Sequence, residues 1–355
     1  MLFDTVTFRC GQQLANRIAL APLTNKQSHV DGLLSDAELA FLARRADGGF
    51  GLISTCAAYV ALDGKAWDGE LGIDRDACIP GLTRLAARLH TTQAKAIVQL
   101  FHGGARADAA LTGQSVWSAS AFQPGVREAT ADDIERTTAA FVEAAARAKT
   151  AGFDGVELHG AHGYVLSQFL SRTMNTRTDA WGGELAHRAR FVREVARGVR
   201  ARCGASFIVG VRLSPEDFGQ AKGLDLDESL EVARWLADDG VDFIHASLWD
   251  VAKNAVKRPD AHPLALFRAA LPTDVVIVTA GKVWTRSDAE HALAHGAGVV
   301  ALGRSAILNP DWPTTVARGA DPTRPPITRA ELAARAVSPP FQQYLTNWKD
   351  FVAGD

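Results

Sequence analysis

The stretch GFDGVELHGAHGYVLSQFL, residues 152–170, joins a short apolar run to a cluster of ring-bearing polar side chains. Its first part, Phe153–Leu158, is typical of a buried strand, because short apolar runs suit strands covered on both faces of a parallel sheet. His159, His162 and Tyr164 then follow within six residues. Side chains of this kind at a strand end predict one wall of an active site.

Seven further apolar runs of the same kind recur along the chain. They are Arg17–Ala21, Phe50–Thr55, Ala96–Leu100, Phe207–Arg212, Val241–His245, Val275–Val278 and Gly298–Leu302. With the first run they make eight expected strands. Eight strands that alternate with helices predict an α/β protein with the (β/α)8 topology of a TIM barrel.

A doubly wound sheet is the alternative arrangement of such strands. That fold usually carries a glycine-rich turn after its first strand, whereas residues 21–24 here read Ala-Pro-Leu-Thr. The barrel is therefore favoured. Helices are expected from apolar spacing over residues 130–151, 225–238 and 286–295, with Thr130, Asp227 and Ser287 as candidate N-caps.

The whole chain, 1–355, is expected to form one domain. Residues 1–15 should form a hairpin that closes the barrel floor, and residues 319–355 a proline-containing tail. The tail should end in a helix over Phe341–Phe351, with Tyr344 and Trp348 on it. We expect this helix to pack on its own barrel; packing on a partner subunit, and hence a homodimer, is the alternative.

Composition narrows the class of protein. The chain is 47% hydrophobic and 22% charged with a formal net charge of −2, which is typical of a globular protein and gives no electrostatic reason to expect nucleic acid. Its four cysteines form no CxxC pair. The sequence shows neither a signal-peptide pattern nor an apolar run of membrane-spanning length. A cytoplasmic protein is predicted.

Barrel enzymes build their sites at the carboxyl ends of the strands. Gly281 follows the seventh expected strand, and Gly303 and Arg304 follow the eighth. Glycines let the backbone approach a ligand closely, and loops after these two strands commonly bind phosphate beside a helix N-terminus. Arg304 would add a charged guanidinium that can donate two parallel hydrogen bonds to a phosphate. The three residues predict a phosphate site.

Gln99 and Arg212 should point polar groups into the middle of the mouth. A glutamine amide can both donate to and accept from the edge of a heterocycle. An arginine there is costly unless it meets an anion or an electron-rich ring. A flavin that carries a phosphate would satisfy the whole set, and Arg212 would stabilise the negative charge of the reduced ring.

His159 and His162 invite comparison with zinc ligands. The mouth offers no obvious third carboxylate or cysteine beside them, so no metal centre is predicted. The two histidines are better suited to donate hydrogen bonds to a substrate oxygen on which charge develops. Tyr164 would then act as the proton donor.

Several motifs together resemble the Old Yellow Enzyme family of FMN-dependent NAD(P)H oxidoreductases. They run in the family's order over nearly the whole chain. They are LANRI and APLT within residues 14–24, QL at 99–100 with HGG at 102–104, the stretch from 144 to 171, NTRTDAWGGE at 175–184, GVRLSPED at 210–217 and ALGRSAILNP at 301–310.

The resemblance implies that FMN lies across the barrel mouth. It implies that His159 and His162 bind the carbonyl or nitro oxygen of a substrate and that Tyr164 donates the proton. Lys26 lies where one branch of the family has a tyrosine that touches substrate. The residues implied to bind FMN are Ala21, Pro22, Leu23, Thr24, Ala57, Gln99, Arg212, Gly281, Gly303 and Arg304.

The implied reaction has two halves. NADH or NADPH first reduces FMN, and an electron-poor alkene then receives the hydride at its β-carbon and the proton of Tyr164 at its α-carbon. An oxidative demethylase or dienoyl reductase of the same family is an alternative, although such relatives commonly add cluster-binding cysteines. A different flavin barrel acting on pyrimidines or tRNA uridine is another, for which Cys56 would be the candidate thiol.

Overall fold

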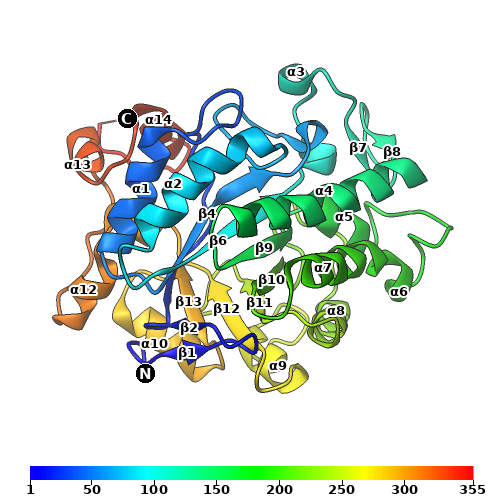
Figure 1. Cartoon of the computed structure of the whole chain (residues 1–355). Coiled ribbons are helices and arrows are strands. Elements are labelled where there is room, and N and C mark those ends of the chain that lie inside the picture. The colour runs from blue at the N-terminus through cyan, green and yellow to red at the C-terminus, as the bar shows by residue number, and fades with distance from the viewer. Residues whose placement is uncertain (355) are drawn as a thin grey trace.

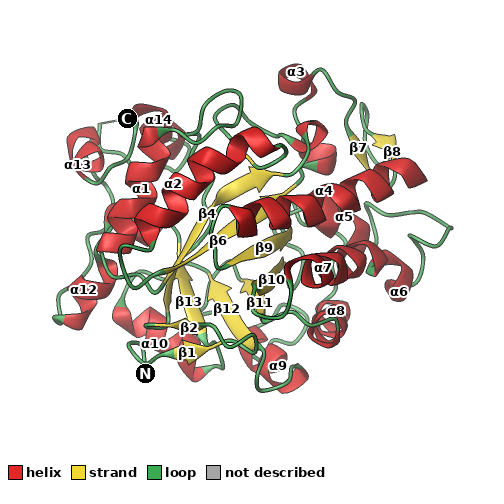
Figure 2. Ribbon diagram, in the orientation of Figure 1, coloured by secondary structure: helices red, strands yellow, loops and turns green. Residues whose placement is uncertain are grey.

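The computed structural model describes residues 1–354 and shows a closed barrel of parallel strands inside a ring of helices (Figures 1 and 2). The sheet order is β3-β13-β12-β11-β10-β9-β6-β4, and an additional β3–β4 pairing closes it. The eight barrel strands are β3 (Ile18–Leu20), β4 (Leu52–Tyr59), β6 (Lys95–Phe101), β9 (Gly155–Gly160), β10 (Ile208–Leu213), β11 (Phe243–Ser247), β12 (Val276–Ala280) and β13 (Val299–Leu302). Each overlaps one of the eight expected strands, so the TIM barrel is confirmed.

The longer helices cover the outside of the barrel and bury one face against it. They are α1 (Asp36–Asp47), α2 (Ile79–Leu89), α4 (Ala131–Thr150), α7 (Arg190–Cys203), α8 (Leu226–Asp238), α9 (Pro263–Ala270) and α10 (Arg286–Ala294). Shorter elements are α3 (Ala109–Thr112), α5 (Val165–Leu170), α6 (Leu185–Arg188), α11 (Arg304–Leu308), α12 (Trp312–Ala317), α13 (Arg329–Ala334), α14 (Pro339–Leu345), three 3-10 turns (Leu62–Gly64, Asp76–Cys78, Gly104–Arg106), the pair β7 (Trp117–Ser118) and β8 (Arg127–Glu128), and β5 (Leu71–Gly72) beside β4.

The predicted N-terminal hairpin closes the floor of the barrel (Figure 1). β1 (Val6–Thr7) pairs antiparallel with β2 (Gln13–Leu14). Phe8 is 1% exposed, and its ring lies 5.7 Å from that of Phe243 inside the barrel. The floor is therefore sealed by apolar packing, which leaves the opposite end of the strands for polar groups.

Two of the three candidate N-caps are wrong. Thr130 caps α4 as predicted. α8 is capped by Asp225, and α10 by Thr285. A cap needs an extended backbone just before the first helical residue so that its side chain can accept from an N–H two or three residues on. Asp227 and Ser287 lie inside the first helical turn instead.

The C-terminal helix is shorter than predicted, because α14 ends at Leu345. Beyond it the backbone of Phe351 accepts from the N–H of Ile327, and the N–H of Ala353 donates to the carbonyl of Ile327. The end of the predicted helix is therefore non-helical chain paired with Ile327. Phe341 is 1% exposed and packs edge-on against Phe41 of α1 at 5.4 Å, so the tail packs on its own barrel as expected. A homodimer stays a prediction.

Within the described residues, none of the helices combines the length and apolar character that crossing a bilayer requires.

Candidate active site

Two cavities of about 290 Å³ each lie at the carboxyl ends of the strands. We call one the histidine cavity, because His159, His162 and Tyr164 line it. We call the other the glycine cavity, after Gly281 and Gly303. They adjoin, since both are lined by Pro22, Leu23, His162, Arg212, Arg304 and Trp348.

The cavities bring together nearly all the site residues expected from the sequence. Lys26 lines neither cavity; its ammonium lies 5.8 Å from the ring centre of Tyr344. Thr24, Ala57, Gln99, His159 and Tyr164 line the histidine cavity, whereas Ala21, Gly281 and Gly303 line the glycine cavity.

The rings of the histidine cavity pack edge to face. His159 lies 5.0 Å from His162 and 4.9 Å from Tyr164, centroid to centroid. The backbone of His162 has a φ of 60°, a left-handed conformation that a non-glycine residue adopts only when its surroundings hold it there. The backbone N–H of His162 donates to Oγ of Ser214 at 3.0 Å, and Arg106 donates to the backbone carbonyl of His162 at 2.7 Å.

Hydrogen bonds assign the tautomer of each cavity histidine. The backbone N–H of Ala161 points at Nδ1 of His159 at 3.4 Å, which leaves the ring proton on Nε2. Arg212 donates to Oγ of Ser247 at 3.0 Å, and the same hydroxyl oxygen lies 2.8 Å from Nε2 of His162. With the hydroxyl proton directed at Nε2, His162 carries its ring proton on Nδ1, and both rings have one N–H to donate.

Burial sets the charge of these groups. It lowers the pKa of His159 well below its usual value, and the neighbouring His162 and Arg212 lower it further. Burial and Arg212 do the same to the pKa of His162. Both rings are therefore neutral near pH 7 and offer hydrogen bonds without giving up a proton.

Tyr164 is surrounded by protein, and burial raises its pKa. The guanidinium of Arg106 opposes that rise from a position 4.2 Å above the ring centre. Phe101 packs edge-on against the same ring at 4.5 Å. The phenol therefore holds its proton at neutral pH, and Arg106 is placed to stabilise the phenolate that remains when the proton leaves.

A buried polar layer lies beneath the mouth. Strand register sets Gln99 beside Glu157, and the Gln99 amide donates to the Glu157 carboxylate at 2.6 Å. His245 binds the other carboxylate oxygen at 2.7 Å. Burial opposes the charge of Glu157, but His245 and Arg212 hold its pKa below the usual value. Gln99 thereby keeps its carbonyl oxygen for a ligand.

Two nitrogens of this layer are buried and lack a hydrogen-bond partner in residues 1–354, namely Nε of Arg212 and Nε2 of His245. The first is a donor, and the second is an acceptor because Nδ1 of His245 carries its proton toward Glu157. A buried polar group without a partner is costly and calls for a ligand or water. Arg212 lines both cavities, so a ring bound across the mouth could satisfy its Nε.

The glycine cavity presents an unpaired cation. Arg304 begins α11 as predicted and is half-buried, and its guanidinium makes no hydrogen bond or ion pair with residues 1–354. Burial lowers its pKa. A Cβ on Gly281 would lie 2.8 Å from the carbonyl oxygen of Leu248, so only glycine fits there. The cavity could hold a phosphate on Arg304.

Aromatic residues that the sequence did not assign to the site also line it. Phe341, Tyr344 and Trp348 come from the C-terminal tail, and Trp67 comes from the loop after β4. Burial raises the pKa of Tyr344, and the hydroxyl of Thr24 beside it opposes the rise. The aromatic content of the tail was visible, but its place over the mouth depends on how the chain folds back.

Cys56, the candidate thiol of the pyrimidine alternative, lies away from the cavities. It is 3% exposed and its Sγ donates to Glu38 at 2.7 Å. Burial raises its pKa well above the usual value, which makes this thiol a poor nucleophile.

Residues 1–322 match the sequence profile of the NADH:flavin oxidoreductase / NADH oxidase family. The chain belongs to this family. The probable NADH-dependent flavin oxidoreductase YqiG of Bacillus subtilis is 37% identical over 90% of this chain and 88% of its own length. The NADH:acrylate oxidoreductase of Vibrio harveyi is 34% identical over 88% of this chain, which spans only 32% of that larger protein.

The crystal structure of an Old Yellow Enzyme homologue from Zymomonas mobilis superposes with a TM-score of 0.83 at 27% identity, over 93% of this chain and 96% of that one. The predicted membership of the Old Yellow Enzyme family is confirmed. The protein is accordingly an oxidoreductase that uses FMN and a nicotinamide cosubstrate.

The donor set of the two cavities fits FMN. The orphaned Nε of Arg212 and the free carbonyl oxygen of Gln99 could meet opposite edges of the flavin ring. The unpaired guanidinium of Arg304 could meet the phosphate beside Gly281 and Gly303.

Proposed function

We propose that the protein reduces the activated C=C bond of α,β-unsaturated carbonyl or nitro compounds at the expense of NADH or NADPH. The observation that carries this proposal is the composition of the histidine cavity. Two neutral histidines, each with an N–H to donate, lie within 5.0 Å of each other, and a proton-bearing Tyr164 lies beside them. The name of the Vibrio harveyi relative adds support, since acrylate is itself an electron-poor alkene.

We assign the cofactor contacts from the lining of the cavities. Bound FMN would supply the hydride for the β-carbon of the alkene. Gly281, Gly303 and Arg304 would hold its phosphate, and Arg212 and Gln99 would bind the edges of its ring. Residues 21–24, which follow β3, and Ala57 of β4 would complete the contact surface.

His159 and His162 bind the carbonyl or nitro oxygen of the substrate. Negative charge grows on this oxygen as the β-carbon accepts hydride, so donors fixed in advance stabilise the transition state more than the ground state. Loss of one such donor typically costs about 2.7–4 kcal/mol. The Arg212–Ser247–His162 chain fixes the donor tautomer before substrate arrives.

Tyr164 protonates the α-carbon. Its raised pKa keeps the proton in place until the enolate forms, and Arg106 stabilises the phenolate afterwards. Solvent then returns the proton. Tyr344 and Trp348 narrow the cavity above the site and would limit the width of the alkenes admitted. Lys26 would influence substrate only through Tyr344.

Purified protein tests this proposal directly. It should be yellow and release FMN on denaturation, and NADH or NADPH should bleach it under anaerobic conditions. A panel of enones and nitroalkenes should then restore the colour, with a saturated ketone as the control. Bleaching without reoxidation by any alkene would overturn the proposed substrate class but leave the cofactor assignment intact.

A further inference from the structure

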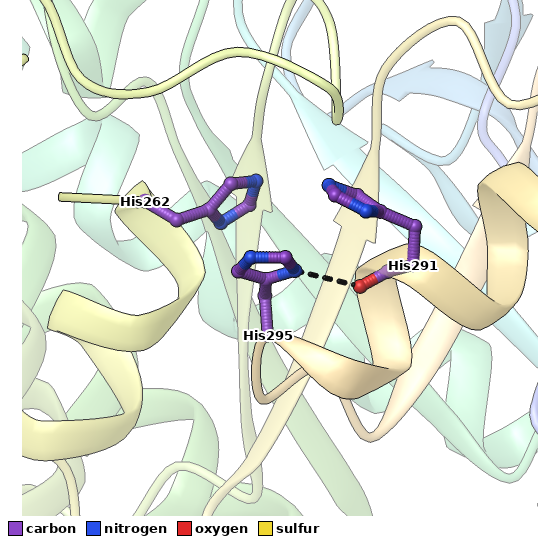
Figure 3. A group of neighbouring side chains, drawn as sticks. All are labelled: His262, His291 and His295. Atoms are coloured by element: carbon purple, nitrogen blue, oxygen red, sulfur yellow. Dashed lines mark hydrogen bonds between the residues drawn. The ribbon is translucent and has the colours of Figure 1, made fainter. Parts of the chain in front are cut away.

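Three histidines come together on the outside of the barrel, away from both cavities (Figure 3). His262 is the N-cap of α9, and His291 and His295 lie one turn apart at the end of α10. The ring of His295 lies 4.2 Å from that of His262 and 4.3 Å from that of His291. One nitrogen from each ring lies within 4.8 Å of the other two.

Backbone carbonyls fix the tautomers of two of these rings. Nδ1 of His295 lies 2.9 Å from the carbonyl oxygen of His291, and Nε2 of His262 lies 2.8 Å from that of Val251. A carbonyl only accepts, so these nitrogens carry the ring protons. The lone pairs are then left on Nε2 of His295 and Nδ1 of His262. A ring N–H donated to a carbonyl is the usual orienting contact of a metal-bound histidine.

An incoming ion would have to replace one hydrogen bond, because Nδ1 of His262 accepts from the N–H of Leu264 at 3.2 Å as the N-cap of α9. The ring of His291 makes no hydrogen bond with residues 1–354 and is exposed. Burial lowers the pKa of His262, and the two neighbouring histidines lower it further. His262 therefore resists protonation.

We propose that His262, His291 and His295 bind a divalent transition-metal ion of the Zn²⁺ type. Three imidazoles without a carboxylate suit Zn²⁺, Ni²⁺ or Cu²⁺ and not Mg²⁺ or Ca²⁺. Zn–N bonds of about 2.0–2.1 Å place ligand nitrogens about 3.3 Å apart in a tetrahedral site. The three nitrogens, which lie within 4.8 Å of one another, would have to move closer, and the exposed His291 ring is the one with room to rotate. Water completes the coordination.

The bound ion would fasten the loop after β11 to α10. The carbonyl of Val251 accepts from His262, and the N–H of Val251 donates to the carbonyl of Gly281 at 3.1 Å. Gly281 lines the glycine cavity. The metal would thus stiffen one wall of that cavity from outside without touching any group that reacts, and its role is structural.

Calorimetric titration of Zn²⁺ into chelator-treated FMN-loaded protein tests the site. We expect one saturable equivalent, a rise in Tm on binding, and a Kd raised at least about tenfold, or 1.4 kcal/mol, in both His291→Ala and His295→Ala. The matched control is His187→Ala, which removes an exposed histidine elsewhere. The proposal is overturned if Zn²⁺ shows no saturable binding. It is also overturned if the Kd of the two cluster variants equals that of the control. The flavin absorbance of every variant should match wild type, which separates this test from that of the active site.

Discussion

Substitution of Tyr164 by phenylalanine tests the proposed proton donor. The change removes one hydroxyl and keeps a ring that packs against Phe101 at 4.5 Å, His159 at 4.9 Å and Arg106 at 4.2 Å. The folded structure should therefore lose little more than one hydrogen bond, about 1 kcal/mol of the free energy of unfolding. A positioned general acid contributes about 10²–10⁴-fold to rate, which is about 3–5 kcal/mol of activation free energy.

Anaerobic stopped-flow absorbance measures the two half-reactions separately. In Tyr164→Phe, flavin bleaching by NADH or NADPH should stay near the wild-type rate, because that step needs no proton from the phenol. Reoxidation by an enone should slow by about 10²–10⁴-fold. In wild type the raised pKa of Tyr164 should keep reoxidation pH-independent at least up to the ordinary tyrosine pKa of about 10, since the proton is present below the pKa and lost above it.

Tyr344→Phe is the matched control, because it deletes a hydroxyl from the same cavity at a residue without a proposed proton role. It should change either half-reaction by less than about tenfold, or 1.4 kcal/mol. If Tyr164→Phe slowed bleaching as much as reoxidation, or left both unchanged, the proton-donor assignment would be refuted.

The remaining predictions concern the tautomer relay, the phosphate contact and acid stability. Ser247→Ala should weaken the binding of an added phenol, whose oxygen would take the place of the substrate oxygen at His162, about tenfold by removing one hydrogen bond of about 1–1.5 kcal/mol. Flavin absorbance titration measures this binding. Ser247→Thr should keep the wild-type affinity, and an equal loss in both variants would contradict the role of the Ser247 hydroxyl. Arg304→Gln should raise the Kd of FMN about 10–100-fold, because hydrogen bonds from a charged group contribute about 1.5–3 kcal/mol. Reconstitution of the apoprotein with FMN, followed by flavin fluorescence, measures this Kd. Arg318→Gln, which changes an exposed arginine, should leave it unchanged. Burial of Asp63 raises its pKa, but hydrogen bonds from His102 and Trp117 outweigh burial and lower it from 3.8 to about 2. Its carboxylate therefore stabilises the fold above pH 3.8, and about 2 kcal/mol should be lost as the pH falls to 2. Denaturant unfolding measured at several pH values should show that Asp63→Asn lacks this part of the pH dependence of the free energy of unfolding. An unchanged pH dependence in the variant would refute the role of Asp63.

The sequence by itself determined the barrel and most of its mouth. Strands buried on both faces need unbroken apolar runs, so all eight were visible as local patterns. The groups that follow such runs must meet at one end of a parallel barrel. His159, Arg212 and Arg304 could therefore be placed together, and the family motifs around them identified the cofactor.

Local pattern placed the ends of α4, α8 and α10 within one residue, but it misassigned two N-caps and carried the C-terminal helix too far. The side chain of Asp225 accepts from the N–H of Asp227 and of Glu228, and that of Thr285 accepts from the N–H of Asp288. These caps depend on the backbone conformation just before each helix, which the spacing of apolar residues does not encode. Beyond the end of α14 at Leu345, Phe351 and Ala353 bond to Ile327 of the preceding segment, a contact between separate stretches of the chain.

Only the tertiary structure decided which distant side chains complete the site. Tyr344 and Trp348 reach the mouth because the tail folds back over it, and Ser247 contacts the ring of His162 from another strand. His262 likewise meets His291 and His295 only because the start of α9 lies against the end of α10. Each of these contacts brings together segments that are far apart in the chain. Strand register and helix packing set such contacts, and no single stretch of sequence contains that information.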